Sequence, residues 1–218
     1  MFRHVAVVSL FAVAALSCGG GNPVKVGDAV PTLLKGVVVK GPVKGATVKV
    51  FRVGDDFARG DELATATTDE AGAFEARLRP FNGAVLVVAS DGTYVEEALG
   101  LEVGLSSNEL ATYVADVRAG GTVDNIRLTP VSTLAVAFTR FHVGRGQAVK
   151  AAWDEARTNL NAHFGTLDWA SVSAADVTKS TSLSQEGRAG VLLAALSSQA
   201  KLLAVASGVS PGLAINAG

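Results

Sequence analysis

The chain has few of the residues that cross-link a protein or charge it strongly. It contains one cysteine, Cys18, so no disulfide can form within the chain. Aromatic residues make up only 6% of it, which does not favour a large aromatic pocket. The formal net charge is −1, and no segment is rich enough in Lys and Arg to favour nucleic acid or a charge-held membrane contact. Beyond the N-terminus we expect no segment with the length and continuity of a transmembrane helix.

Motifs of familiar catalytic or metal-binding chemistry are also missing. The chain has no H-E-x-x-H, no histidine–cysteine cluster and no G-x-S-x-G elbow. The glycine tract at residues 19–21 lacks the preceding strand and the lysine of a phosphate-binding loop. We therefore expect no catalytic residue, no metal and no cofactor.

What is present begins with a secretory signal peptide, predicted over residues 1–17. Arg3 and His4 form a short basic start, and a mostly apolar run follows from Val5 to Leu16. This run is too short to cross a bilayer as a mature helix, and it ends in small residues. A basic start, an apolar run and small residues, in this order, predict export of the protein.

Cys18 follows this run directly, and it allows two interpretations. It is either a stray thiol in an ordinary signal or the lipidated first residue of a mature lipoprotein. The segment ending at Cys18 resembles a bacterial lipobox, with the small residue Ser17 before the cut, although Ala15 stands where leucine is preferred and the leucine is Leu16. We favour lipidation. Gly19 stands where aspartate would retain an inner-membrane lipoprotein, so the resemblance implies an outer-membrane address, facing the periplasm or the surface.

Residues 18–31 then form the anchor and a flexible Gly/Pro-rich tether, and residues 32–128 alternate between short strands and turns. Phe74 alternates with charged neighbours such as Glu75, which predicts a buried ring beside an exposed carboxylate. Asp69–Gly72 is predicted as a hairpin loop and Asp91-Gly92 as a type I′ hairpin turn. We expect strands over 33–39, 46–51, 63–68, 74–79, 85–89, 93–98, 109–117 and 122–128, forming an antiparallel β-sandwich.

Residues 34–100 also carry a family resemblance. The stretches LKGVVVKGPVKGATVKVF, LATATTDEAGAF and GAVLVVASDGTYVEEA resemble the carboxypeptidase-regulatory-like, or transthyretin-like, module of secreted bacterial proteins. The resemblance implies a prealbumin-like sandwich and supplies no catalytic residue. Gly45 and Gly72 would permit its turns, and Asp69 can hydrogen-bond its own loop.

From Thr129 the apolar period becomes helical, which predicts a small all-α region over residues 129–218. Thr129 is a suitable cap for a helix with Pro130 in its first turn. Ser182 with Gln185 is a predicted capping box for a last helix over 185–206. Apolar residues recur at helical spacing as Leu134, Ala135, Phe138 and Phe141, then as Val149, Trp153, Ala156 and Leu160.

The segment LTPVSTLAVAF resembles the entry to helical regions of large bacterial surface lipoproteins. The helices either pack on the sandwich and finish the fold, or the chain is a shortened member of a longer family. The second interpretation predicts that Leu192, Leu196 and Leu203 are partly exposed.

Four acidic residues, Asp55, Asp56, Asp61 and Glu62, lie in a predicted loop. Calcium is a conceivable ligand because it prefers hard oxygens, but the spacing matches no EF-hand, and we favour a solvated acidic loop.

Other polar and aromatic residues have structural interpretations. Glu96 and Glu97 would point to opposite faces of one strand, which excludes a paired acid and base. His142 and His163 lie near helix ends, where contact with the last carbonyls is commoner than metal ligation. Trp153 fits a helix core better than a sugar-stacking role.

The sequence therefore predicts an α+β protein, an antiparallel prealbumin-like β-sandwich followed by a small all-α region. We expect a non-enzymatic outer-membrane or cell-surface lipoprotein, held at the membrane by its lipid anchor. Its sandwich would serve as a binding or spacer module, with an unidentified glycan or protein as ligand and no nucleic acid. The alternatives are an accessory fragment of a secreted carbohydrate-active enzyme or peptidase, and a purely structural envelope component.

Overall fold

The computed structural model describes residues 29–96, 100–105, 108–164 and 184–208. The predicted signal peptide, Cys18 and most of the tether lie outside these residues, so the predictions made for them stand as predictions. The same holds for Glu97 and Ser182.

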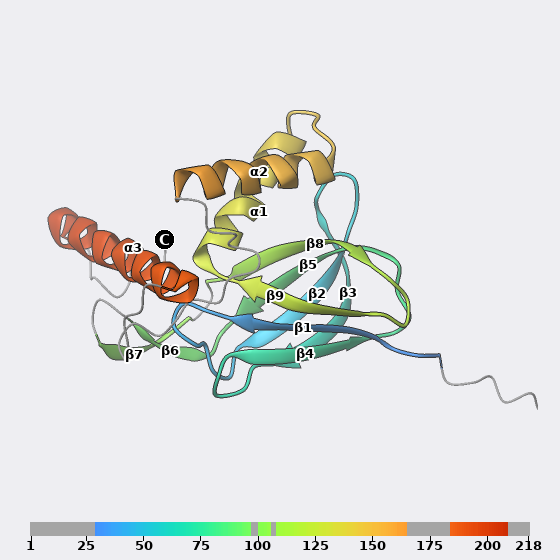
Figure 1. The fold of residues 1–218 in the computed structure, drawn as a ribbon, viewed down its shortest axis with the longest axis horizontal. Coiled ribbons are helices and arrows are strands. Elements are labelled where there is room, and N and C mark those ends of the chain that lie inside the picture. Colours follow the sequence, from blue (N-terminus) through green and yellow to red (C-terminus); the bar gives the residue numbers. More distant parts are fainter. Residues whose placement is uncertain (1–28, 97–99, 106–107, 165–183, 209–218) are drawn as a thin grey trace, which may run out of the picture.

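The strands form three sheets within the described residues (Figure 1). The first has the order β4-β1-β9, the second β3-β2-β5-β8, and the third pairs β6 with β7. The strands are β1 (Thr32–Val38), β2 (Thr47–Val53), β3 (Arg59–Thr67), β4 (Ala73–Leu78), β5 (Gly83–Ser90), β6 (Thr93–Glu96), β7 (Leu101–Gly104), β8 (Leu110–Val117) and β9 (Thr122–Leu128); the helices are α1 (Pro130–Val143), α2 (Val149–His163) and α3 (Gln185–Ser207).

The two larger sheets share one hydrophobic core, to which every second residue of most strands contributes. Val48 and Val50 of β2 enter it from one sheet, and Phe74 and Ala76 of β4 enter it from the other. Phe74 is 5% exposed and its neighbour Glu75 is exposed, as the alternation predicted. The register of β4 is therefore confirmed.

The pairing of β1 with β9 is parallel, which corrects the expectation of an all-antiparallel sandwich. Leu34 lies opposite Val123, and Val37 lies opposite Arg127, with a register shift between Leu34 and Gly36. The backbones approach so closely there that a Cβ on Gly36 would lie 2.2 Å from the carbonyl oxygen of Ile126. Only glycine fits this position without moving a backbone.

Both predicted hairpins join strands of different sheets. Asp69 Oδ1 accepts hydrogen bonds at 2.9 Å from the backbone N–H groups of Ala71 and Ala73, so the loop has the predicted internal bonding. It nevertheless carries the chain from β3 in the four-stranded sheet to β4 in the three-stranded sheet. Asp91 and Gly92 both have positive φ, as a type I′ turn requires, but β5 and β6 do not pair. Local turn chemistry was predictable, whereas the partner strand was not.

A second core lies on the other face of the four-stranded sheet, where α1 and α2 cover it (Figure 1). Leu86 and Val88 of β5 point into it while Val85 and Val87 point into the first core. Because β5 is covered on both faces, its sequence is continuously apolar, as a central strand requires. Helices α1 and α2 thus pack on the sheet as a further layer.

Candidate functional site

The four acidic residues predicted as a cluster are divided between two elements. Asp55 and Asp56 lie in the turn after β2, where Asp56 Oδ1 accepts a hydrogen bond from the Ala58 N–H at 3.1 Å. Asp61 and Glu62 lie within β3, which corrects their assignment to the loop. A hydrogen bond from Thr65 and the nearby Lys49 ammonium lower the pKa of Glu62. The described residues contain no group of three or more acidic, His or Cys side chains placed to hold a metal ion.

The histidines and Trp153 occupy the structural positions that the sequence indicated. His142 and His163 lie in the last turns of α1 and α2. Trp153 is 6% exposed and packs edge-on against Tyr113 at 5.5 Å between ring centroids, and Tyr113 packs on Phe57 at 5.4 Å. Trp153 therefore connects α2 to the sheet and belongs to the core.

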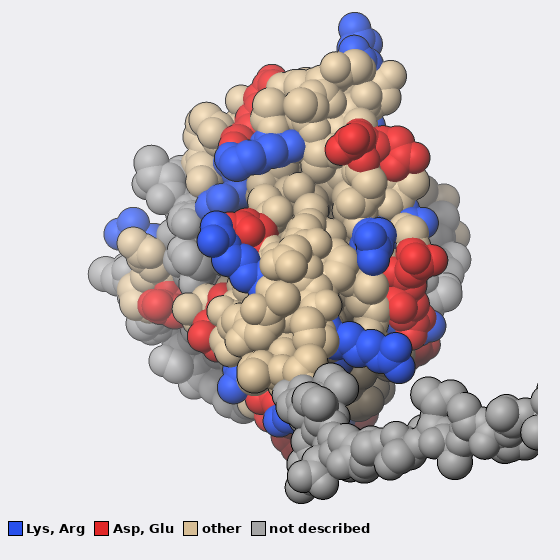
Figure 2. Space-filling view, turned by 90° about the vertical axis from the view of Figure 1, so that its right-hand side faces the viewer, with Lys and Arg blue, Asp and Glu red and all other residues tan. Residues whose placement is uncertain are grey.

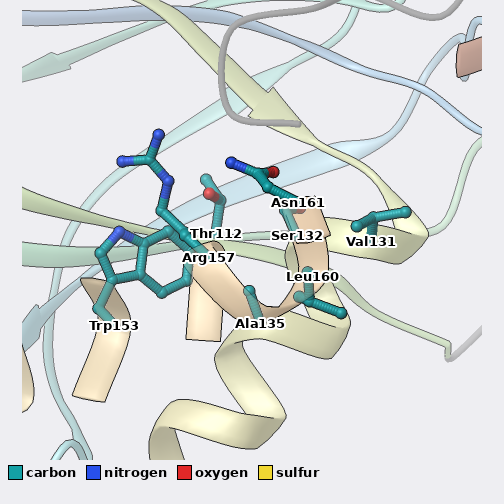
Figure 3. Close-up of a pocket in the computed structure, with 8 residues that line it drawn as sticks. All are labelled: Thr112, Val131, Ser132, Ala135, Trp153, Arg157, Leu160 and Asn161. Atoms are coloured by element: carbon teal, nitrogen blue, oxygen red, sulfur yellow. The ribbon is translucent and has the colours of Figure 1, made fainter. Parts of the chain in front are cut away.

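Beside Trp153 lies a narrow crevice between α2, α1 and β8 (Figure 3). Arg157 and Asn161 on α2 face Thr112 on β8 and Ser132 on α1. The cavity has a volume of about 10 Å³, enough for one water molecule at most. This crevice is a packing feature, in spite of the four polar residues that line it.

A much larger hollow lies between α1 and α3. Its volume is about 420 Å³, within the range of pockets that hold small ligands or inserted side chains. Most of its lining is apolar, and within the described part of the chain Lys40 and Glu109 are the charged residues that line it. We call it the α1–α3 groove; it is lined by Lys40, Glu109, Leu110, Pro130, Val131, Thr133, Leu134, Ala137, Phe164, Leu193, Leu196 and Ser197.

The charged groups at the edge of this groove have structural partners. The guanidinium of Arg59 donates to both carboxylate oxygens of Glu109, with Nη1 2.9 Å from Oε1. This hydrogen bonding lowers the pKa of Glu109 and raises that of Arg59. Lys40 Nζ lies 5.6 Å from the centroid of the Tyr94 ring. The groove therefore offers mainly apolar contact.

The start of α1 is held as the sequence predicted. Thr129 Oγ1 accepts from the Ser132 N–H at 3.0 Å, and Ser132 Oγ accepts from the Thr129 N–H at 2.8 Å. This reciprocal capping box fixes where the helix begins and therefore which face meets the sheet.

The face of α1 that is buried differs from the one expected. Of the predicted row Leu134, Ala135, Phe138 and Phe141, only Ala135 is buried. The other three are 42%, 44% and 59% exposed, because Val131, Ala135, Val136 and Thr139 occupy the side toward the sheet. Helix α1 is thus apolar on two sides. The sequence could have indicated this, because its apolar residues form more than one stripe along the helix.

Helix α3 is also more apolar than a single buried stripe requires. Its 23 residues make it about 35 Å long, and by length and composition it could cross a bilayer. The expectation that no segment beyond the N-terminus has this length and continuity is therefore wrong. Ala189 and Leu193 pack in the second core, and Ser184 Oγ accepts a hydrogen bond from the Gly187 N–H near the helix start.

The face that Figure 2 shows carries many charged side chains, unlike the mostly apolar α1–α3 groove. There, acidic and basic side chains are interspersed, and neither sign gathers over a large area. This surface has no electrostatic feature of an anion or cation site.

Comparisons with known proteins leave the chain without a family. No family model matches it, and no curated protein matches it. Among solved structures, a DUF3823 family protein from Parabacteroides merdae ATCC 43184 aligns at 17% identity over 46% of each chain, with a TM-score of 0.30. A 9R-lipoxygenase from Cyanothece PCC8801 aligns at 13% identity over 58% of this chain and 24% of its own, with a TM-score of 0.24. At such scores neither structure identifies the fold or the function. The class that the structure itself defines is α+β, with several antiparallel strand pairs and C-terminal helices.

Proposed function

We propose that this chain is a non-enzymatic cell-envelope lipoprotein, held at the outer membrane through Cys18, in which the sheets form a spacer and the α1–α3 groove binds an apolar partner. The observation that carries the binding role is the groove itself, about 420 Å³ in volume and mostly apolar in lining. Binding of this kind depends on burying apolar surface and needs no reactive side chain.

The spacer role is supported by how tightly the sheet region is built. We propose that its two larger sheets form a prealbumin-like sandwich of the carboxypeptidase-regulatory-like type. Gly45 has a φ of 68°, and the Ala46 that follows is fully buried and donates its N–H to Thr68 Oγ1 at 2.8 Å. Thr68 Oγ1 in turn donates to the Val43 carbonyl at 2.7 Å. Thr68 thereby ties the turn that follows β3 to the turn that precedes β2.

The anchor would attach at the end of the molecule opposite the groove-forming helix. Strand β1 begins at the right of Figure 1, while α3 lies at the left. Fully extended, residues 19–31 would span at most about 45 Å. The proposed arrangement holds the sheets near the membrane and directs the α1–α3 groove away from it.

The anchor is tested by the Cys18→Ser variant of the full chain. We expect the wild-type protein to be in the membrane fraction with a lipid-modified Cys18 by mass spectrometry. The variant should leave that fraction or retain its signal peptide. An unmodified Cys18 in a released, soluble protein would contradict the anchor.

The groove is tested by a binding screen with glycans and with apolar peptides. Ala137 lines the groove, so Ala137→Trp should fill it and abolish peptide binding. Ala119 is exposed at the turn between β8 and β9, and Ala119→Trp is the matched control that should bind normally. Glycan binding that survives Ala137→Trp would assign the function to another surface.

A further inference from the structure

The α1–α3 groove has a cationic residue beside the start of α1. Lys40 follows strand β1, and the neighbouring Val39 N–H donates a hydrogen bond to the Leu128 carbonyl at 2.9 Å, two residues before Pro130 begins α1. Lys40 lines the groove although it is only 9% exposed. Because a helix dipole is positive at its N-terminus, this end of α1 adds to the positive potential of the Lys40 ammonium. This part of the groove therefore favours an anion.

The acidic residue that lines the groove has cations of its own. Arg59 donates hydrogen bonds to both carboxylate oxygens of Glu109. The positive charge of Arg140, in the last turn of α1, is also close enough to lower the pKa of Glu109. Two guanidinium groups therefore compensate Glu109, and it does not need Lys40 as a counter-ion.

The walls of the groove offer mainly carbon atoms. Leu134 of α1 and Leu196 of α3 line it and are 42% and 39% exposed, so both side chains have surface left for contact. Thr133 also lines the groove, but its Oγ1 accepts from the Ala111 N–H at 2.9 Å and donates to the Thr129 carbonyl at 2.8 Å. Among the described lining residues, a peptide backbone would therefore find few partners for its N–H and C=O groups, whereas a hydrocarbon chain needs none.

We propose that the α1–α3 groove binds a free long-chain fatty acid, with its carboxylate on Lys40 and its hydrocarbon chain between α1 and α3. This inference rests on the proposed function, because it names the chemical class of the apolar partner. An ammonium has three N–H donors, so Lys40 can hold a carboxylate in addition to its contact with the Tyr94 ring, whose centroid lies 5.6 Å from Nζ. A hydrogen bond between two charged groups is stronger than one between neutral groups, and a mostly apolar site strengthens it further.

A glycan and a bilayer surface fit the groove less well than a single acyl chain. A glycan would place hydroxyl groups against Leu134 and Leu196, where they would lose their hydrogen bonds to water. A flat bilayer surface cannot fill a concave groove. A single acyl chain can enter it, and gains affinity with every methylene that it buries.

The test is photolabelling of the full chain in phosphatidylcholine nanodiscs. The probes are a diazirine derivative of hexadecanoic acid and the matched derivative of hexadecanol, and mass spectrometry locates the labelled residues. We expect both probes to label α1 and α3 where these helices line the groove. Each probe also partitions into the bilayer, equally for every variant, so differences between variants report on the protein.

The variants separate the charge of Lys40 from the shape of the groove. Lys40→Gln should raise the concentration of acid needed for half-maximal labelling about tenfold, the loss expected for one charge-assisted hydrogen bond. It should leave labelling by the alcohol unchanged, which also shows that the groove is folded, and Lys40→Arg should keep most of the affinity for the acid. Lys35 pairs with Glu75 at 3.1 Å and does not line the groove, so Lys35→Gln is the matched control that should label as the wild type does. Ala137→Trp should block both probes.

Three results would overturn the fatty acid. These are the absence of groove labelling by the acid, a half-maximal concentration of acid that Lys40→Gln leaves unchanged, or an equal effect of Lys40→Gln on the acid and the alcohol. Peptide binding that Ala137→Trp blocks, without labelling by either probe, would reject the fatty acid and retain the groove as a binding site. Loss of both peptide binding and labelling in the wild type would reject the binding role of the groove as well.

Discussion

The sheet region and the helical region differ in how completely they bury their apolar residues. Strand β4 alternates strictly between core and solvent, and β5 is apolar throughout because both of its faces are covered. In α1 and α3, apolar residues lie on both sides, and the body of the molecule covers only one of them. Alternation with a period of two therefore predicts which residues of a strand are buried. A helix that is apolar on all sides does not show which of its faces packs against the rest of the molecule.

The sharpest difference is expected from Phe74 and Glu75, which are neighbours in β4. Phe74→Ala should destabilise the fold by about 3–5 kcal/mol, because the ring is 5% exposed in the shared core. Glu75 forms surface ion pairs with Lys35 and Arg77, so Glu75→Ala should change the free energy of unfolding by about 0.5 kcal/mol or less. Urea titration of both variants measures this. Equal effects would show that the strand is in the other register.

The same contrast exists along a single helix in α3. Leu193→Ala should cost about 2–3 kcal/mol, because its side chain is 2% exposed in the second core. Leu202→Ala should cost less than about 0.5 kcal/mol, since the Leu202 side chain is 65% exposed.

Hydrogen exchange on the full chain extends that measurement to each amide of α3. We expect protection to fall from Leu193, which is held in the second core, toward Val205, which is exposed. Strong, uniform protection over residues 191–206 in a monomer would contradict an exposed apolar face on α3.

The sheet region was easier to predict from the sequence than the helical region, because strands show which residues are buried and these helices do not. Alternating, continuously apolar or Thr/Ala-rich runs located eight of the nine described strands, and β7, only four residues long, was missed. Strand partners were not predictable, since the parallel pairing of β1 with β9 joins segments about ninety residues apart. The helix cap at Thr129 and the hydrogen bonding of Asp69 within its loop were predictable, because each depends on residues within one turn.

The candidate site was not found from the sequence, and the reason is physical. Leu134, Phe138 and Phe141 have the spacing of a core row, and nothing local distinguishes them from Val131, Ala135 and Val136. Which row faces the sheet depends on the angle at which α1 begins, and the Thr129–Ser132 box sets that angle. The groove exists only once α3, distant in sequence, lies alongside.

The capping box offers a smaller effect at the junction of the two regions. Thr129→Ala should destabilise the protein by about 1 kcal/mol, because it removes the acceptor for the Ser132 N–H in a buried site. Thr158 in α2 bonds only to the Asp154 carbonyl of its own helix and is exposed, so Thr158→Ala should change stability by less than about 0.5 kcal/mol. Thermal unfolding of the two variants gives the comparison, and an unaffected Thr129→Ala would mean that packing alone sets the start of α1.

The smallest effect is expected where the edge of the groove meets the four-stranded sheet, at the Arg59–Glu109 pair. Both side chains are more than a third exposed, so Glu109→Gln should cost at most about 1 kcal/mol at pH 7. The hydrogen bonds from Arg59 lower the pKa of Glu109 in the folded protein below its usual value of 4.5. The contribution of the pair is therefore fully present above pH 4.5 and is lost as the pH falls through the lower folded value. Urea titrations of the wild type and Glu109→Gln should converge once the pH falls below the folded pKa of Glu109 and should also approach each other in 1 M salt. A difference that persisted at acidic pH would mean that Glu109 acts through packing against the α1–α3 groove, which would place this residue with the apolar partner surface and not with the charged rim.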